Sequence, residues 1–278
     1  MDVFTSVPFK GNPVAVIMDG DSLEKNQMQA IANWTNLSET TFICKPTHDN
    51  ADYRLRIFTP KRELPFAGHP TIGSAWAYLQ SGAKAKTKGR LVQECGKGLI
   101  TIKVEDQVLF FALPEPVFQT PSDAVKLSMA SALGISTDEM MLASVVDVGA
   151  VWLTIQLESV EKVLQLEPDM TMLAKTGKDL FVGVTVFGLH EKNSEAAVEV
   201  RSFAPAFGIP EDPVCGSGNG CVAALIQQHK ILEASSYMAS QGQALGRKGR
   251  VMVEFDRDNT IWLGGSSVTC INGFVTIY

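Results

Sequence analysis

Short apolar runs dominate the chain, and most of them alternate with polar residues or stop after a few positions. Such runs predict strands rather than helices. They lie at 13–18, 40–45, 52–58, 107–113, 151–157, 180–187, 197–203, 260–265 and 273–278. Two segments differ, because 71–82 and 220–230 are apolar around most of a helical circumference. That pattern predicts helices that are buried on nearly all sides.

Two more helices are predicted from their end signals. Asp21 with Glu24 forms a candidate capping box in front of residues 22–34. Ser122 and Gly134 bracket another helix, as its N-cap and its C-terminal glycine. We expect both helices to lie on the outside of the molecule.

The sequence motif that leads into each of the two apolar helices is an internal repeat. The stretch ELPFAGHPTIGSAWAY, at 63–78, has the same plan as EDPVCGSGNGCVAALI, at 211–226. Upstream, RIFTP matches RSFAP, and downstream the strand at 96–106 resembles that at 246–258. The matched positions include Glu63 with Glu211, Pro65 with Pro213, and Gly68 with Gly216.

The duplication predicts two similar halves. Three prolines in the segment 112–123 mark the boundary between them. We therefore expect halves at 1–116 and 117–278, with the C-terminal strand a candidate to complete the first half, and an active site in the cleft between them. Strands outnumber helices and often follow one another directly, so a doubly wound parallel sheet fits poorly. The predicted class is α/β (α+β), with a sheet wrapped around a central helix in each half.

Composition narrows the function class. The chain has 278 residues, of which 45% are hydrophobic and 19% charged, and a net charge of −6. No run predicts a membrane span, and the N-terminal residues do not resemble a signal peptide. One basic cluster, at 84–90, is interpreted as a solvated loop, so neither nucleic acid nor membrane is expected as a partner. Five scattered cysteines suggest neither a disulfide framework nor a zinc site, which favours a cytoplasmic protein without metal.

Each glycine turn stands at the start of a predicted helix. Free backbone N–H groups and the helix dipole favour an anion there, so we expect a carboxylate or phosphate near Thr71 and Ser217. Glycine lets a ligand approach the backbone and tolerates positive φ. Close packing of a buried helix is the plain alternative. A dinucleotide site is a weaker one, because two prolines precede GSGNG where that motif needs an apolar strand.

Four stretches occur in order along the chain: FKGNPVAVI (9–17), NLSETTF (36–42), RIFTPKRELPFAGHPTIGSA (56–75) and EDPVCGSGNG (211–220). Together they resemble the PhzF family, the phenazine-biosynthesis isomerases and their relatives. The resemblance implies the fold of diaminopimelate epimerase, a homodimer, and cofactor-independent proton transfer on a small carboxylated substrate. It does not identify the substrate.

The resemblance also implies roles for individual residues. Glu39, in LSET, corresponds to the glutamate that moves the proton, and its apolar neighbours favour a raised pKa. His69 and Asp212 correspond to the other catalytic positions. From the residues alone, Glu39 also fits a surface acid or a strand-end cap, and Asp212 fits a turn former. The remaining histidines, His48, His190 and His229, lie in no motif and are expected at the surface.

The substrate-binding positions lie at the two glycine turns. They are Gly68, Gly73, Cys215, Gly216, Ser217 and Gly218. For Ser217, a helix cap is the alternative role.

Cys215 decides between reaction types. Its counterpart in the repeat is Ala67, whereas epimerases of similar plan carry a thiol at both places. Symmetric two-thiol racemisation is therefore disfavoured, although a thiol at a helix start can have a depressed pKa. The sequence leaves two alternatives to the isomerase open. One is a two-base epimerase or racemase of a small amino or hydroxy acid, and the other is a non-catalytic organic-acid-binding protein.

Overall fold

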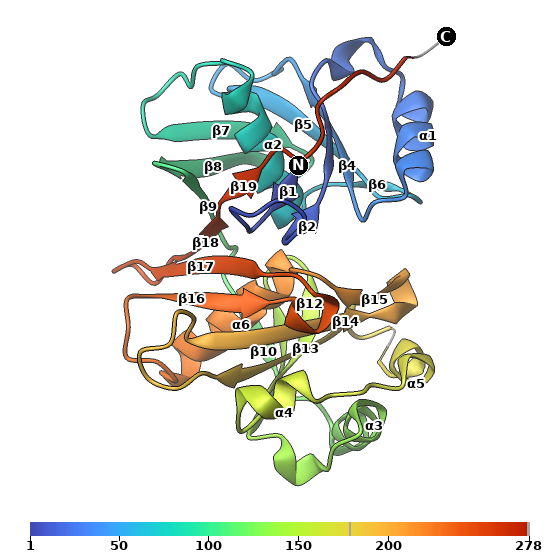
Figure 1. The fold of residues 1–278 in the computed structure, drawn as a ribbon, viewed down its shortest axis with the longest axis vertical. Helices are drawn as coiled ribbons and strands as arrows, with labels where there is room; N and C mark the ends of the chain where they lie inside the picture. The colour runs from blue at the N-terminus through green and yellow to red at the C-terminus, as the bar shows by residue number, and fades with distance from the viewer. Residues whose placement is uncertain (178, 277–278) are drawn as a thin grey trace. The chain divides into compact units, whose positions relative to one another are not determined.

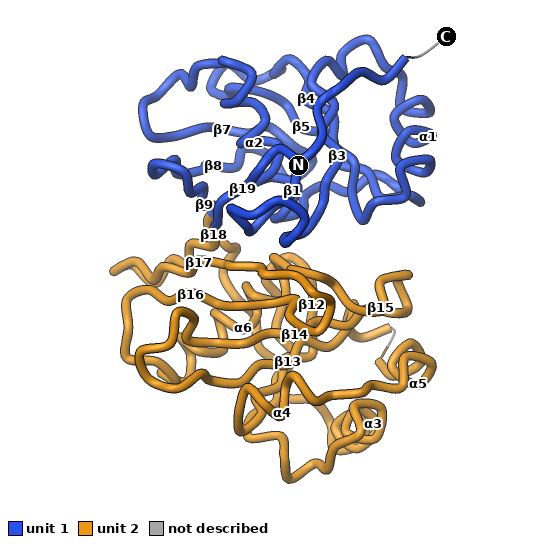
Figure 2. The backbone as a smooth tube through the Cα atoms, viewed as in Figure 1, with its two compact units in different colours: residues 1–111, 265–278 blue, residues 112–264 orange. Residues whose placement is uncertain are grey.

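The computed structural model describes residues 1–177 and 179–276. The chain divides into two units (Figures 1 and 2). Unit 1 comprises Met1–Phe111 and the C-terminal segment from Gly265, and unit 2 comprises Ala112–Gly264. No helix of the described part of the chain has the length and apolarity needed to cross a bilayer.

Unit 1 is built on a mixed sheet with the order β3-β4-β5-β7-β8-β9, and β6 pairs with β5. A small sheet, β19-β1-β2, lies on the other side of helix α2, which contacts both sheets. The strands are β1 (Asp2–Val3), β2 (Asn12–Pro13), β3 (Ala15–Ile17), β4 (Thr40–Cys44), β5 (Tyr53–Phe58), β6 (Glu63–Leu64), β7 (Arg90–Cys95), β8 (Gly98–Glu105), β9 (Val108–Ala112) and β19 (Ser267–Val268). The helices are η1 (Gly20–Ser22), α1 (Lys25–Thr35) and α2 (Gly68–Gln80).

Unit 2 has the sheet order β10-β11-β12-β13-β14-β16-β17-β18, and β15 pairs with β14. Helix α6 packs on the sheet through β11, β12, β13 and β17. The strands are β10 (Val117–Gln119), β11 (Leu142–Asp147), β12 (Val151–Gln156), β13 (Gly183–Leu189), β14 (Val198–Ala204), β15 (Ile209–Asp212), β16 (Ser236–Gln241), β17 (Gly249–Phe255) and β18 (Ile261–Gly265). The helices are α3 (Asp123–Leu133), α4 (Val160–Leu164), α5 (Met170–Lys175) and α6 (Gly216–His229), with η2 (Thr137–Glu139), η3 (Pro205–Phe207) and η4 (Gln243–Leu245).

The two units repeat the same sequence of strand directions. In unit 1, β3 and β4 are parallel, β5 is antiparallel to β4, β7 is parallel to β5, and β8 and β9 follow antiparallel. In unit 2, β12, β13, β14, β16, β17 and β18 repeat that pattern step for step. The predicted mixed α/β fold of two similar halves, each with a central helix, is thus confirmed.

A bidentate arginine–glutamate pair recurs at the same place in each unit. Arg56 donates to both oxygens of Glu63, at 2.8 and 3.0 Å, and so joins β5 to β6. Arg201 donates to both oxygens of Glu211, at 2.9 Å each, and joins β14 to β15. Two parallel N–H···O bonds fix the angle between the joined segments. The matched glutamates of the sequence repeat therefore hold the hairpin that leads into each central helix.

A buried hydrogen bond between polar side chains, one of them on the central helix, also occurs in both units. In unit 1, Gln93 donates to the Thr71 hydroxyl at 3.0 Å. In unit 2, Asn219 donates to Gln241 at 2.7 Å. Both pairs join the first turn of the helix to the strand that follows it. Sequence comparison missed this match because isolated polar residues carry no periodic signal.

The ends of the outer helices are partly as predicted. Ser122 caps α3, since its hydroxyl accepts from the Val125 N–H, and Gly134 ends the helix with φ of 73°. The predicted capping box of α1 is wrong in register: Glu24 is the N-cap and pairs with Gln27. Asp21 instead accepts from the Lys45 N–H with both oxygens.

The burial of the two central helices differs. Helix α6 is buried over almost all its length, as predicted, whereas α2 is buried only from His69 to Ala75. The predicted strand at 273–278 is wrong for residues 273–276, which form no strand, and residues 277–278 lie outside the described residues. Alternation in so short a terminal run indicates a strand only where a neighbouring strand can pair with it.

Candidate active site

Glu39 and His69 come together in unit 1. Helix α1 ends at Asn36, which is left-handed with φ of 53°, and this turn places Glu39 immediately before β4. His69 is the second residue of α2, and Pro70 follows it in the first turn, where backbone N–H groups need no partner within the helix. Oε2 of Glu39 lies 3.5 Å from Nδ1 of His69, and their side chains are 14% and 8% exposed.

The imidazole of His69 is neutral. Burial lowers the pKa of His69 to about 4, the carbonyl of Pro13 opposes that effect, and the N-terminal ammonium adds to it. At neutral pH the contact with Glu39 is therefore between a carboxyl group and an uncharged ring rather than an ion pair. A neutral ring can still exchange a proton with its neighbour, because it carries one N–H and one lone pair.

Asp212 is the last residue of β15 in unit 2 and is half-buried. Burial raises the pKa of Asp212 to about 6, the Val214 N–H and the Cys215 thiol oppose the shift by hydrogen bonding, and Glu211 adds to it. The Val214 N–H donates to Oδ1 at 3.1 Å. A carboxyl group with a pKa near 6 can both accept and release a proton near neutral pH.

Asp212→Asn is expected to stabilise the protein at pH 7.5. The folded pKa lies above the ordinary value of 3.8, so the folded state binds more protons between those two values, and stability falls as the pH rises through the window. With allowance for partial exposure, the gain is about 1–2 kcal/mol in the free energy of unfolding. Urea unfolding at pH 7.5 and pH 4 measures it. The gain should fall to about a fifth at pH 4, close to the ordinary pKa. The exposed control Asp123→Asn should show no gain, and a gain equal at both pH values would contradict the assignment.

Cys215 caps α6 and is not a reactive thiolate. Its sulfur accepts from the Gly218 N–H at 3.2 Å, so Cys215 rather than Ser217 is the N-cap. Burial raises the pKa of the Cys215 thiol well above its usual range, and the nearby Asp212 raises it further. The depressed pKa that a helix start allows is therefore not found, because desolvation outweighs the helix start.

Ser217 lies in the first turn of α6 and contacts a residue that the sequence did not single out. The indole Nε1–H of Trp152, on β12, donates to Oγ of Ser217 at 3.0 Å. Trp152 is 4% exposed and Ser217 is half-buried. The alternative that Ser217 caps the helix is wrong.

Packing accounts for several of the motif glycines. A Cβ on Gly68 would come within 2.6 Å of the Phe111 ring, and one on Gly218 within 2.6 Å of the Ser202 hydroxyl. At Gly73 the obstacles are Val14 and Val3, at 2.7 and 2.8 Å. Within residues 1–177 and 179–276, the glycines with positive φ lie elsewhere. The tolerance of glycine for positive φ is therefore not what these turns use. Substrate binding at Gly68, Gly73, Gly216 and Gly218 stays a prediction.

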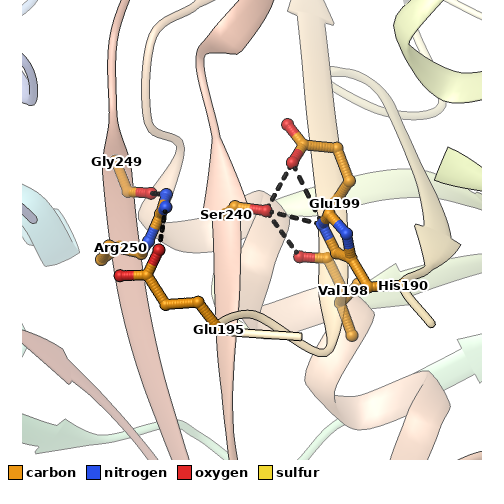
Figure 3. Close-up of polar contacts among 7 residues, drawn as sticks. All are labelled: His190, Glu195, Val198, Glu199, Ser240, Gly249 and Arg250. Atoms are coloured by element: carbon orange, nitrogen blue, oxygen red, sulfur yellow. Dashed lines mark hydrogen bonds and ion pairs between the residues drawn. The ribbon is translucent and has the colours of Figure 1, made fainter. Parts of the chain in front are cut away.

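A separate polar cluster in unit 2 is formed by Glu199 on β14, Ser240 on β16 and His190, which follows β13 (Figure 3). The Ser240 hydroxyl lies between His190 Nε2, at 3.0 Å, and Oε2 of the buried Glu199, with which it makes a short hydrogen bond. Nε2 of His190 is also 3.4 Å from Glu199. His190 is half-buried rather than fully at the surface as expected, since its side chain is 24% exposed and paired. His48 and His229 are exposed as expected.

This cluster does not have the geometry of a nucleophilic triad. In such a triad the acid holds one imidazole nitrogen and the serine contacts the other. In this cluster Glu199 and Ser240 both face the same nitrogen, and Ser240 is 6% exposed. The cluster therefore gives the buried carboxyl group of Glu199 a hydrogen-bond partner and links β14 to β16 (Figure 3).

Comparison with known proteins places the chain in a family. The family model for phenazine biosynthesis-like proteins (PhzC-PhzF) matches residues 1–273. The chain is 43% identical to antisense-enhancing sequence 1 of Schizosaccharomyces pombe, over 98% of this chain and 96% of that protein. It is 34% identical to the trans-2,3-dihydro-3-hydroxyanthranilate isomerase of Pseudomonas aeruginosa, over 90% of this chain and 87% of that protein.

A solved structure agrees. The PhzF-family phenazine biosynthesis protein of Bacillus anthracis has a TM-score of 0.83 at 24% identity, covering 95% of this chain and 93% of that one. At this identity the likeness shows the fold, and the sequence relatives show the family. The chain belongs to the PhzF family and is an isomerase of that family.

Proposed function

We propose that the protein is a cofactor-independent isomerase that moves a proton between two carbons of a small carboxylated substrate. Glu39 takes the proton from one carbon and returns it to another. His69 is its neutral partner, and Asp212 manages charge on the polar groups of the substrate. The expectation that the two units share one active site stays a prediction.

The contact between Glu39 and His69 carries this proposal. The carboxyl group of Glu39 is 14% exposed and the imidazole that it faces is uncharged, so a change in its charge breaks no ion pair with His69. Moving a proton from carbon to carbon needs such a reversible acceptor. Asp212, with a pKa of about 6, supports the same chemistry.

The substrate class is proposed from the relative in Pseudomonas aeruginosa, whose name gives trans-2,3-dihydro-3-hydroxyanthranilate. This compound is a ring carboxylic acid with conjugated double bonds, so a proton removed from carbon leaves a delocalised anion. That chemistry needs an acid–base group and groups that bind a carboxylate.

The experiment is proton exchange in deuterium oxide. The protein is incubated with trans-2,3-dihydro-3-hydroxyanthranilate, and NMR follows isomerisation and deuterium at ring carbons. The Pseudomonas aeruginosa relative serves as the positive control. Catalysed isomerisation is expected. Neither isomerisation nor exchange, with the control active, would refute this substrate; exchange with inversion at one carbon would favour an epimerase.

Cys215→Thr is expected to keep most of this activity. The thiol has a raised pKa and serves as a helix cap, and threonine offers an oxygen in the same role. We expect the rate to stay within about threefold, less than 1 kcal/mol of barrier. Initial rates and a thermal unfolding curve measure both properties. A fall of several decades in a folded variant would restore a thiol mechanism.

A further inference from the structure

The strand registers identify the position in unit 2 that matches Glu39. Phe58 of RIFTP and Phe203 of RSFAP are equivalent in the repeat. Their partners on the neighbouring strand are Thr40 and Val184. Stepping back one residue from each partner gives Glu39 in unit 1 and Gly183 in unit 2. The second unit therefore carries no side chain where the first carries its carboxyl group.

The indole of Trp152 lies at this vacant position. Trp152 is the register partner of Gly183, and a Cβ on Gly183 would come within 2.8 Å of the ring atom Cζ3. The same register argument makes Val14 the unit 1 equivalent of Trp152, because Ala15 pairs with Thr40 and Leu153 with Val184. A small aliphatic residue beside a glutamate is thus replaced by a large ring beside a glycine.

The partner of the indole is also the equivalent residue. His69 and Ser217 occupy the same place in the two helix starts, since the alignment that pairs Gly68 with Gly216 pairs them as well. In unit 1 the contact is carboxyl to imidazole, at 3.5 Å. In unit 2 it is indole N–H to hydroxyl, at 3.0 Å. An acid–base pair in one unit corresponds to a hydrogen-bonded pair without a base in the other.

This hydrogen bond occupies one of the two lone pairs of Ser217 Oγ and leaves the hydroxyl hydrogen to be donated. An indole N–H is a donor only, so the serine oxygen accepts and its single hydrogen points elsewhere. Within the described residues, the other polar contact of this hydroxyl is the Cys215 sulfur at 3.6 Å. Sulfur is a weak acceptor, and it already accepts from the Gly218 N–H.

We infer that Trp152 is a positioning residue that orients Ser217 as a hydrogen-bond donor. Ser217 then donates to a carboxylate oxygen of the substrate. Unit 2 supplies no base from the position equivalent to Glu39. The inference rests on the proposed function, since it assigns the substrate carboxylate to Ser217. It goes beyond that function in naming the residue that orients the serine and the position from which the base is missing.

The test compares two probes by calorimetry. 3-Hydroxyanthranilate is the aromatic analogue of the proposed substrate, and 2-aminophenol is the same molecule without the carboxylate. The variants are Trp152→Phe, Ser217→Ala and the double variant, with Trp262→Phe as a control in the same unit. We expect Ser217→Ala to weaken binding of 3-hydroxyanthranilate about tenfold and Trp152→Phe about fivefold, as for one lost or misaligned hydrogen bond.

Coupling distinguishes positioning from general loss of packing. The double variant should bind 3-hydroxyanthranilate no more weakly than Ser217→Ala, because Trp152 acts through Ser217. Binding of 2-aminophenol should be unchanged throughout. The inference would be overturned if the two single losses of affinity multiplied in the double variant. It would also be overturned if Trp152→Phe bound 3-hydroxyanthranilate as tightly as the wild type, or if 2-aminophenol lost as much affinity as 3-hydroxyanthranilate.

A ligand-free measurement separates this inference from the proposed function. If the wild type does not bind 3-hydroxyanthranilate, the proposed substrate class fails, and exchange of the indole N–H in labelled protein then decides the inference. The Trp152 N–H should exchange far more slowly than that of Trp34, which is 84% exposed, and Ser217→Ala should speed it. Exchange as fast as Trp34 in the wild type, or no effect of Ser217→Ala, would overturn the donor assignment.

Discussion

Glu39→Gln should abolish proton transfer while leaving the fold and ligand binding intact. Glutamine keeps the shape and a hydrogen-bonding oxygen beside His69, but it cannot accept a proton from carbon. Loss of a general base costs about 10²- to 10⁴-fold in rate, roughly 3–5 kcal/mol of barrier. Deuterium incorporation into trans-2,3-dihydro-3-hydroxyanthranilate and its initial rate of isomerisation measure the effect.

The control for Glu39→Gln is Glu105→Gln, the exposed last residue of β8 in the same unit. It should keep the wild-type rate. Binding of 3-hydroxyanthranilate by Glu39→Gln should change little, which separates loss of chemistry from loss of binding. Near wild-type exchange in Glu39→Gln would show that another group, His69 or Asp212 first, is the base.

Arg201→Met should cause a large loss of stability, much larger than Arg56→Met at the equivalent position. Arg201 is 5% exposed, and besides the bidentate bond to Glu211 its Nη1 donates to the carbonyls of Val163 and Leu166, at 3.1 and 2.8 Å. Methionine would leave Glu211 buried without its cation. Breaking one side of such a pair costs about 3–5 kcal/mol.

The matched pair in unit 1 provides the comparison. Arg56 and Glu63 are 22% and 26% exposed, and Lys25 also reaches Glu63 at 3.1 Å, so water and a second cation can compensate for the lost arginine. We expect a loss of about 1 kcal/mol for Arg56→Met. Urea unfolding followed by circular dichroism measures both variants. Equal losses would show that burial does not govern the two pairs.

The architecture was predictable because it repeats. Two glycine turns, each downstream of a strand-proline motif and followed by an apolar helix, identified the halves, and periodicity identified the two buried helices. Arg56 and Arg201 are the first residues of RIFTP and RSFAP, yet only the structure shows that they form bidentate hydrogen bonds with the matched glutamates. A repeat predicts that two residues are equivalent, but it does not predict which atoms they contact.

The site was predictable only where a motif fixed it. Glu39 and His69 lie together as their motifs suggested, although nothing in the sequence gave the neutral state of His69, which depends on burial by distant segments. The raised pKa of the Cys215 thiol depends on burial in the same way, because a helix start and desolvation act in opposite directions on a thiol pKa. Trp152 was missed because a tryptophan in a strand is usually core.

The glycine at 183 makes the difference between the units hard to reverse. A Cβ there would lie 2.2 Å from the Phe203 carbonyl oxygen, which is backbone and cannot rotate aside. No side chain can therefore return to this position while β13 and β14 keep their register, even if Trp152 were replaced by a smaller residue. Restoring a carboxylate in unit 2 would take at least two coordinated changes and a shift of a strand. A lineage that reached this arrangement from a symmetric ancestor would have passed a step that single substitutions do not retrace.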